Sequence, residues 1–444
     1  MNLDIIVPLL YPAAILACLL SLWRPQIGLY YLVFVLPLQT LRYQIPGYPL
    51  GNSIIDVVLL GVMIGMLLNR TAPLFADLPM KWLLAAAALY WYISLWHGSF
   101  VLGLPWPIAL ADPRFSNWKN YIELSLLFGI TFAVIRTKEQ IRVVLVIMCV
   151  TAFAVSYDFF QFMSAQDLSQ YSDKLRYAGV MGYAGVNGLA AFEAQFALFL
   201  TGFYNSKLPK GYKIAISLVL AGCTYAVLFA FSRGAYMAFA AGLLFVGIMR
   251  KRFILVVLMA VLLGGSMFLP AAVMERITGT YTQESGSDQG TLESSAQERV
   301  IIWQDAMEVV KTFPVRGTGF DTYHYMHRSL GYGDTHNFYL KVLVEEGIVG
   351  LLFLIAILWK MLRQGYGLFR ISSDPLLSSL GLGFAACIVG ALVTNFFGDR
   401  WSYQQVDSYW WILLALVCRA RLLESDSGEE PAPEAELVPE GAMS

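Results

Sequence analysis

The chain has 444 residues, of which 58% are hydrophobic and only 14% are charged, and its formal net charge is −1. Its mean hydropathy of +0.61 lies well outside the range of soluble globular domains, which excludes a soluble enzyme or binding domain. We therefore expect an all-α polytopic membrane protein whose partners include membrane lipids and no nucleic acid.

Apolar stretches recur along the whole chain, and most are about 17 to 25 residues long, which is enough to cross a bilayer as a helix. They predict about 12 or 13 transmembrane helices, at 4–22, 26–42, 53–68, 80–97, 118–135, 143–164, 188–204, 214–231, 234–249, 253–270, 337–359, 376–397 and 406–418. The predicted domains are transmembrane helices and short loops over 1–270, a large outer loop over 271–335, further transmembrane helices over 336–420, and a disordered acidic cytoplasmic tail over 421–444.

The distribution of basic residues predicts the orientation. Lys and Arg gather in short loops at every second boundary between spans, which the positive-inside rule assigns to the cytoplasm. These residues are Arg70, Lys81, Arg136, Lys138, Arg142, Lys207, Lys210, Lys213, Arg250, Lys251, Arg252, Lys360, Arg363, Arg370, Arg419 and Arg421. All four histidines, His97, His324, His327 and His336, then fall on or near the opposite face.

The large outer loop has two parts of different character. Its first half, "GTYTQESGSDQGTLESSAQ", is polar and too poor in apolar residues to fold alone. In the following "ERVIIWQDAMEVVKTF" apolar residues recur at helical spacing, which predicts an amphipathic helix that ends at Pro314. The apolar face is assigned to Ile302, Trp303, Ala306, Met307, Val310 and Phe313. A glycine-rich turn, "RGTGFD", then returns the chain to the bilayer.

The stretch "GDTHNFYLKVLVEEG", residues 333–347, places a histidine at the outer start of a span. Asp334 or Thr335 is the expected N-cap of a helix that begins near His336. A neutral imidazole there can accept a proton from a substrate hydroxyl, as a general base does. The alternative is that His336 only hydrogen-bonds to the backbone at the membrane interface. Within this helix, Lys341 and Glu345 are spaced as an i,i+4 ion pair.

Three arginines lie on the same outer side. Arg233 follows Ser232 at a tight turn between two spans, where a helix N-terminus also presents free N–H groups. Arg176 precedes a glycine-punctuated loop that leads to Asn187, and Arg299 opens the amphipathic helix. Guanidinium groups bind phosphate oxygens bidentately, so three of them would hold a diphosphate without a metal. The alternative is that each arginine only anchors the chain at the interface.

Acidic residues within the predicted spans keep a different class of function open, because a proton-coupled transporter also uses intramembrane carboxylates. They are Glu123, Asp158, Glu193, Glu345 and Glu346. Against a transporter, the sequence shows neither an internal repeat nor a pair of broken helices at corresponding positions of two halves.

The run "RVIIWQDAMEVVKTFPVRGTGFDTY", followed by "THNFYLKVLVEEGIVG", resembles the signature region of the O-antigen ligase and O-antigen polymerase superfamily of bacterial inner membranes. "SRGA" and "GVNGLA" are further matching pieces, and the motifs span roughly residues 170 to 355.

This resemblance implies transfer of a glycan from undecaprenyl diphosphate to an acceptor hydroxyl on the periplasmic face, with inversion and without a cofactor. His336 would be the general base, and Arg176, Arg233 and Arg299 would bind the diphosphate. Supporting positions are Asn187, Ser232, Asp334, Asn337 and Tyr339.

The preferred acceptor is the lipid A-core of lipopolysaccharide, which would make the protein an O-antigen ligase. The alternatives within the superfamily are an O-antigen or exopolysaccharide polymerase and a protein O-oligosaccharyltransferase. No metal site is predicted, because the outer loops lack a D-x-D motif and because His324 and His327, although spaced i,i+3, have no third ligand nearby.

Overall fold

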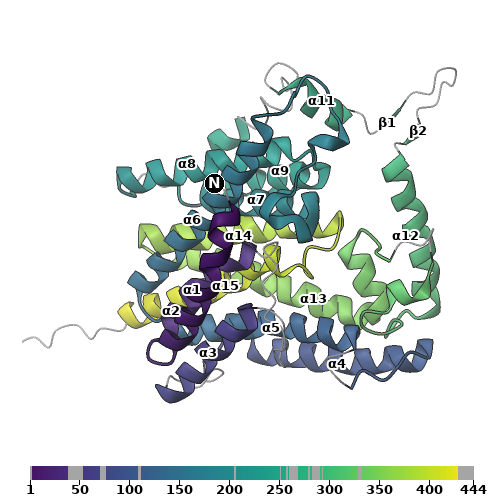
Figure 1. Ribbon diagram of the computed structural model, residues 1–444, viewed down its shortest axis with the longest axis horizontal. Helices are drawn as coiled ribbons and strands as arrows, with labels where there is room; N and C mark the ends of the chain where they lie inside the picture. Colours follow the sequence, from purple (N-terminus) through teal and green to yellow (C-terminus); the bar gives the residue numbers. More distant parts are fainter. Residues whose placement is uncertain are drawn as a thin grey trace, which may run out of the picture.

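The computed structural model describes residues 3–38, 54–70, 77–108, 112–204, 207–250, 252–256, 259, 269–278, 281–282, 291–292, 294–328 and 333–428. They form a helical bundle (Figure 1). Its α-helices are α1 (Leu3–Ser21), α2 (Pro25–Val35), α3 (Ile54–Leu68), α4 (Lys81–Leu102), α5 (Pro113–Val134), α6 (Lys138–Met163), α7 (Gly185–Thr201), α8 (Lys210–Phe229), α9 (Arg233–Met249), α11 (Ala271–Thr278), α12 (Ser294–Thr312), α13 (Phe338–Ile371), α14 (Pro375–Phe396) and α15 (Gln404–Gly428). Short 3₁₀ helices are η1 (Leu36–Leu38), η2 (Asp173–Leu175), η3 (Gly179–Ala184) and η4 (Tyr323–Met326).

The predicted spans coincide with helices wherever the structure describes them, so the all-α polytopic fold is confirmed. Four of the described helices, α6, α8, α13 and α14, are long and apolar enough to cross a membrane by length and composition alone. The predicted span at 253–270 lies mostly outside the described residues. Helix α15 continues to Gly428, so residues 421–428, which the sequence assigned to the disordered tail, are helical.

Small residues let the central helices approach closely. A methyl group added at Gly383 of α14 would collide with the backbone oxygen of Phe199 of α7, and one at Gly202 would collide with Gly383 itself. Close backbone approach through glycine is a common way of packing helices inside a membrane. It holds the C-terminal end of α7 against the first half of α14, and α9 packs against both.

The outer loop contains the amphipathic helix that the sequence predicts. It begins with α11 and a short antiparallel pair of strands, β1 (Tyr281–Thr282) and β2 (Thr291–Leu292), and continues into α12, which stands across the end of α13 (Figure 1). Ile302, Ala306 and Val309 form the buried stripe of α12. Met307 and Phe313, which the sequence placed on the apolar face, are 41% and 36% exposed, so they lie outside the stripe that packs on the protein.

The segment that follows α12 packs against a break in α13. Gly347 interrupts the helix with φ +64°, and the backbone of Val315 passes so close that a methyl group at Gly347 would collide with it. Residues 314–318 hydrogen-bond to the interrupted helix: the Thr318 N–H donates to the Val344 oxygen (2.9 Å), and the Ile348 N–H donates to the Pro314 oxygen (3.0 Å). The glycine-rich return turn therefore fastens the outer loop to the start of α13.

Candidate active site

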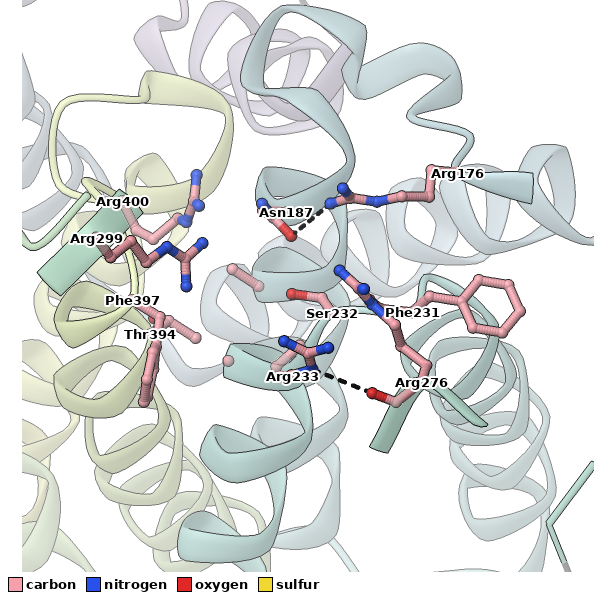
Figure 2. A pocket seen from close by; sticks show the side chains of 13 residues that line it. Arg176, Asn187, Phe231, Ser232, Arg233, Arg276, Arg299, Thr394, Phe397 and Arg400 are labelled. Carbon is pink, nitrogen blue, oxygen red and sulfur yellow. Dashed lines mark hydrogen bonds between the residues drawn. The ribbon is translucent and has the colours of Figure 1, made fainter. Parts of the chain in front are cut away.

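Five arginines converge on one pocket at the starts of α7 and α9 and the end of α14 (Figure 2). The pocket has about 600 Å³ of empty space, which includes its open mouth. Figure 2 shows Arg299 and Arg400 on one side, facing Arg176, Arg233 and Arg276. The remaining lining residues are Asn187, Ala191, Phe231, Ser232, Gly234, Ala235, Thr394 and Phe397.

The start of α9 forms the floor of this pocket. Ser232 is the N-cap residue but makes no side-chain cap hydrogen bond, and Ser232, Gly234 and Ala235 line the pocket together with Arg233. The N-terminus of a helix carries N–H groups without intrahelical partners and a partial positive charge, both of which favour a bound anion. The pocket therefore combines a helix N-terminus with a set of guanidinium groups.

The side chains of Arg233 and Arg276 connect α11 to the turn before α9. The Arg233 Nε donates to the Arg276 carbonyl oxygen (3.0 Å), and the Arg276 Nε donates to the carbonyl oxygen of Phe231 (3.3 Å). The Arg276 guanidinium also lies over the ring of Tyr171, 4.8 Å from its centroid. These contacts fasten α11 to the turn before α9, which places both guanidinium groups at the same pocket.

Arg176 reaches the pocket from the end of η2. Its terminal Nη2 donates to the side-chain oxygen of Asn187 on α7 (3.1 Å), and this hydrogen bond holds the arginine at the pocket. The Nε of Arg176 is buried and has no hydrogen-bond partner in the described part of the chain. A buried N–H donor without a partner is costly, and a bound anion would satisfy it.

Arg400 comes from the loop between α14 and α15, and the sequence interpretation missed it together with Arg276. Its backbone N–H donates to the Asn395 side chain (3.0 Å), and its side chain is folded back over Gly398. A signal existed for both, because Arg276 and Arg400 lie in segments that the basic-residue pattern assigns to the outer face. Only the folded chain shows that they face the other three arginines.

The Gly398→Ala substitution should displace Arg400. A methyl group at Gly398 would stand 2.7 Å from Nη2 of Arg400, and the φ of +152° at this position is unfavourable for residues with a Cβ. We expect the affinity for a diphosphate ligand to fall about tenfold to a hundredfold, the cost of one charged hydrogen bond. A binding titration with inorganic pyrophosphate checks this, and Gly211→Ala is the control because a methyl group there meets nothing within 4 Å.

The pocket concentrates positive charge. Burial lowers the pKa of Arg299, and the charges of Arg400, Arg233, Arg176 and Arg276 lower it further. Burial also lowers the pKa of Arg400, although the charges of Asp399 and Asp334 oppose this shift. A guanidinium group whose pKa is lowered by neighbouring positive charges, as that of Arg299 is, would be stabilised by a multiply charged anion, and two or more such groups can bind a diphosphate bidentately.

His336 lies in the loop just before α13. Its φ is +52°, in the left-handed region, and its side chain is 38% exposed. The Asp334 carboxylate accepts the His336 backbone N–H (3.1 Å) and lies 3.4 Å from the His336 Nδ1. Burial alone would raise the pKa of Asp334, but the hydrogen bond from His336 and the charge of Lys341 lower it. Asp334 therefore orients the imidazole from its Nδ1 side.

The expected N-cap was wrong. Asn337 caps the helix, its side-chain oxygen accepting the Leu340 N–H (3.2 Å), and α13 begins at Phe338. The Tyr339 hydroxyl donates to the Leu392 carbonyl oxygen of α14 (2.8 Å). Asn337 and Tyr339 therefore have structural contacts that hold the first turn of α13 in place.

The His336 loop borders the arginine pocket without lining it. The Trp303 indole N–H donates to the Thr335 carbonyl oxygen (2.9 Å), so α12, which also carries Arg299, contacts the residue just before His336. On the other side, Lys341 pairs with Asp399 (3.0 Å), the neighbour of Arg400. The expected Lys341–Glu345 pair was wrong, because Glu345 instead accepts the Tyr323 backbone N–H (3.0 Å).

The acidic residues that suggested a transporter all have protein partners. Glu123 lies 3.5 Å from the Lys119 ammonium group, and Asp158 accepts a hydrogen bond from the Tyr177 hydroxyl (3.3 Å). Glu193 accepts from the Ser156 hydroxyl (3.0 and 3.1 Å). Glu345 accepts from backbone N–H groups, and Glu346 accepts from the Trp91 indole N–H (3.1 Å). Each contact joins or braces structural elements. Within the described ranges, no group of three or more His, Cys, Asp or Glu side chains is arranged to hold a metal ion.

One comparison with known proteins gives a match. Residues 215–355 match the family model described as O-Antigen ligase. The matched segment contains Arg233, Arg276, Arg299 and His336, whereas Arg176 and Arg400 lie outside it. No curated protein matches the chain.

Proposed function

Because this chain belongs to the O-antigen ligase and O-antigen polymerase superfamily, we propose that it transfers a glycan from undecaprenyl diphosphate to the lipid A-core of lipopolysaccharide. The family match confirms the resemblance carried by the sequence motifs and supports ligase- or polymerase-type glycosyl transfer. We place the reaction on the periplasmic face of the bacterial inner membrane, because the basic loops mark the opposite ends of the helices as cytoplasmic.

The observation that carries this proposal is the convergence of five arginines at the N-terminus of α9, beside the loop of His336. A diphosphate is the multiply charged group that such a pocket fits best. It would be held from both walls, by Arg299 and Arg400 on one side and by Arg176, Arg233 and Arg276 on the other.

The proposed reaction is a direct displacement at the anomeric carbon of the donor. The acceptor hydroxyl loses its proton to His336, its oxygen forms a bond with the anomeric carbon, and the bond from that carbon to the diphosphate oxygen breaks. Direct displacement inverts the anomeric centre. The arginines stabilise the negative charge that develops on the departing undecaprenyl diphosphate, so the barrier is lowered mainly by electrostatics and positioning.

We expect the reaction to continue when a chelator is present, because the arginines supply the positive charge that a divalent ion would bring to a diphosphate. Loss of transfer on chelation and its recovery on adding Mg²⁺ or Mn²⁺ would contradict this part of the proposal.

The acceptor is tested by incubating the purified protein and a lipid-linked glycan in chelator, with and without lipid A-core, and by separating the products on a gel. A product shifted onto lipid A-core supports the ligase. A ladder formed from the donor alone would identify a polymerase, and transfer only to an added protein would identify a protein O-oligosaccharyltransferase. If the donor instead stays intact and moves across sealed vesicles that contain the protein, the transporter replaces the transferase.

A further inference from the structure

We infer that α12 couples the arginine pocket to His336, and that Trp303 is the positioning residue that carries this coupling. The inference rests on the proposed function, because it concerns the same donor and the same base. It goes beyond that function in assigning a role to a residue that does not line the arginine pocket.

Arg299 and Trp303 lie on one face of α12. They are four residues apart, so their side chains are neighbours along the helix. The first lines the arginine pocket, and the second donates its indole N–H to the Thr335 carbonyl oxygen at 2.9 Å. The Trp303 ring also packs edge-on against Phe396 at the end of α14, with 5.7 Å between the ring centroids. A single turn of helix therefore joins the two halves of the site.

His336 needs outside support because its backbone is in the left-handed region, with φ +52°. A non-glycine residue persists there only when its surroundings hold it. Asp334 supplies a hydrogen bond to the His336 N–H, and the Thr335 hydroxyl donates to the Asn337 carbonyl oxygen (2.7 Å), but these residues belong to the same loop. The hydrogen bond from Trp303 fastens this loop to a different element.

The position of α12 makes it suitable for coupling. It packs on the bundle through a narrow stripe, in which Ala306 and Val309 meet Leu340 and Val344 of α13, while its opposite face is exposed. A diphosphate bound by Arg299 would restrict α12, and through Trp303 it would restrict Thr335 and His336. Binding energy of the donor would thus be used to present the base to the acceptor.

The Trp303→Phe substitution tests the role of the indole N–H, because phenylalanine keeps an aromatic ring next to Phe396 and lacks the donor. We expect kcat for transfer to fall about tenfold, while KM for the lipid-linked donor stays unchanged. Trp106→Phe, at a half-exposed tryptophan outside the site, is the matched control. An unchanged kcat, or a rise in KM alone, would overturn the inference.

A second experiment asks whether Trp303 acts through His336. In a His336→Ala background rescued by added imidazole, the base no longer depends on the loop, so adding Trp303→Phe should have no further effect. A further loss there would show that Trp303 acts elsewhere. Full activity of His336→Ala without imidazole would instead overturn the general base of the proposed function, which keeps the two failures distinct.

The coupling can also be measured without transfer. Inorganic pyrophosphate should slow hydrogen–deuterium exchange in residues 333–340 of the wild-type protein, as well as in α12. Trp303→Phe should still bind pyrophosphate but lose the protection of residues 333–340. If pyrophosphate binds the wild-type protein and protects α12 but leaves residues 333–340 unchanged, the inference is wrong whether or not the variant folds.

Discussion

Replacing His336 with alanine should lower the rate of glycan transfer by about 10²- to 10⁴-fold, the contribution typical of a general base. The imidazole is partly exposed and oriented by Asp334, and the loop that carries it borders the arginine pocket. The substitution should leave membrane insertion and binding of the lipid-linked donor intact, because His336 lies outside the lining of the pocket. The rate of product formation by purified protein measures the effect.

Two further variants separate chemistry from folding. Asparagine tolerates the left-handed backbone at position 336 better than alanine but cannot act as a base at neutral pH, so His336→Asn should be as inactive as His336→Ala. His327→Ala, at an exposed histidine of the same outer loop, should keep transfer within about twofold of wild type, as surface substitutions usually do. Near wild-type transfer by His336→Asn would show that His336 is not the base.

Changing Arg233 to lysine should raise KM for the lipid-linked donor about tenfold. Lysine keeps the positive charge but loses the planar fork that binds two phosphate oxygens. It also lacks the Nε that holds the Arg276 carbonyl oxygen at 3.0 Å, so a second guanidinium loses its support. Initial rates at varied donor concentration measure the change.

The control for this substitution is Arg328→Lys. Arg328 forms a bidentate pair with Asp305 on the exposed side of α12, with Nη2 2.7 Å from Oδ1 and Nε 3.2 Å from Oδ2. Surface ion pairs contribute little, so KM for the donor should stay close to the wild-type value. If Arg233→Lys and Arg328→Lys behave alike, Arg233 is an interfacial anchor and no part of the donor site.

Most of the fold could be predicted from the sequence because length and hydropathy dominate inside a membrane, where every backbone polar group must be satisfied within a helix. The amphipathic helix α12 was predicted for a similar reason. Met307 and Phe313 were assigned to its apolar face from their helical spacing, but only a narrow stripe of α12 contacts α13, and these two side chains lie outside it. The width of that contact depends on the neighbouring helix, which the local sequence does not contain.

Part of the candidate site could be predicted from the sequence. The wrong predictions, of the helix cap and of the partner of Lys341, have one physical origin. The local rules that favoured Asp334 or Thr335 as a cap, and Glu345 as the partner of Lys341, consider only neighbours along the chain. In the folded protein Asp334 accepts the His336 N–H instead, and Lys341 pairs with Asp399 from another loop. Arg276 and Arg400 were missed because they reach the pocket from separate segments.

The central claim is that the arginine pocket binds the diphosphate of a polyprenyl-linked donor. The most direct test measures the affinity of the purified protein for undecaprenyl diphosphate, undecaprenyl monophosphate and undecaprenol, in chelator, for the wild type and for Arg233→Lys. We predict that the wild type binds the diphosphate most tightly, that added salt weakens this preference, and that Arg233→Lys reduces it. Equal affinity for the three lipids, unchanged by the substitution, would mean that the protein recognises only the lipid chain and would contradict the account.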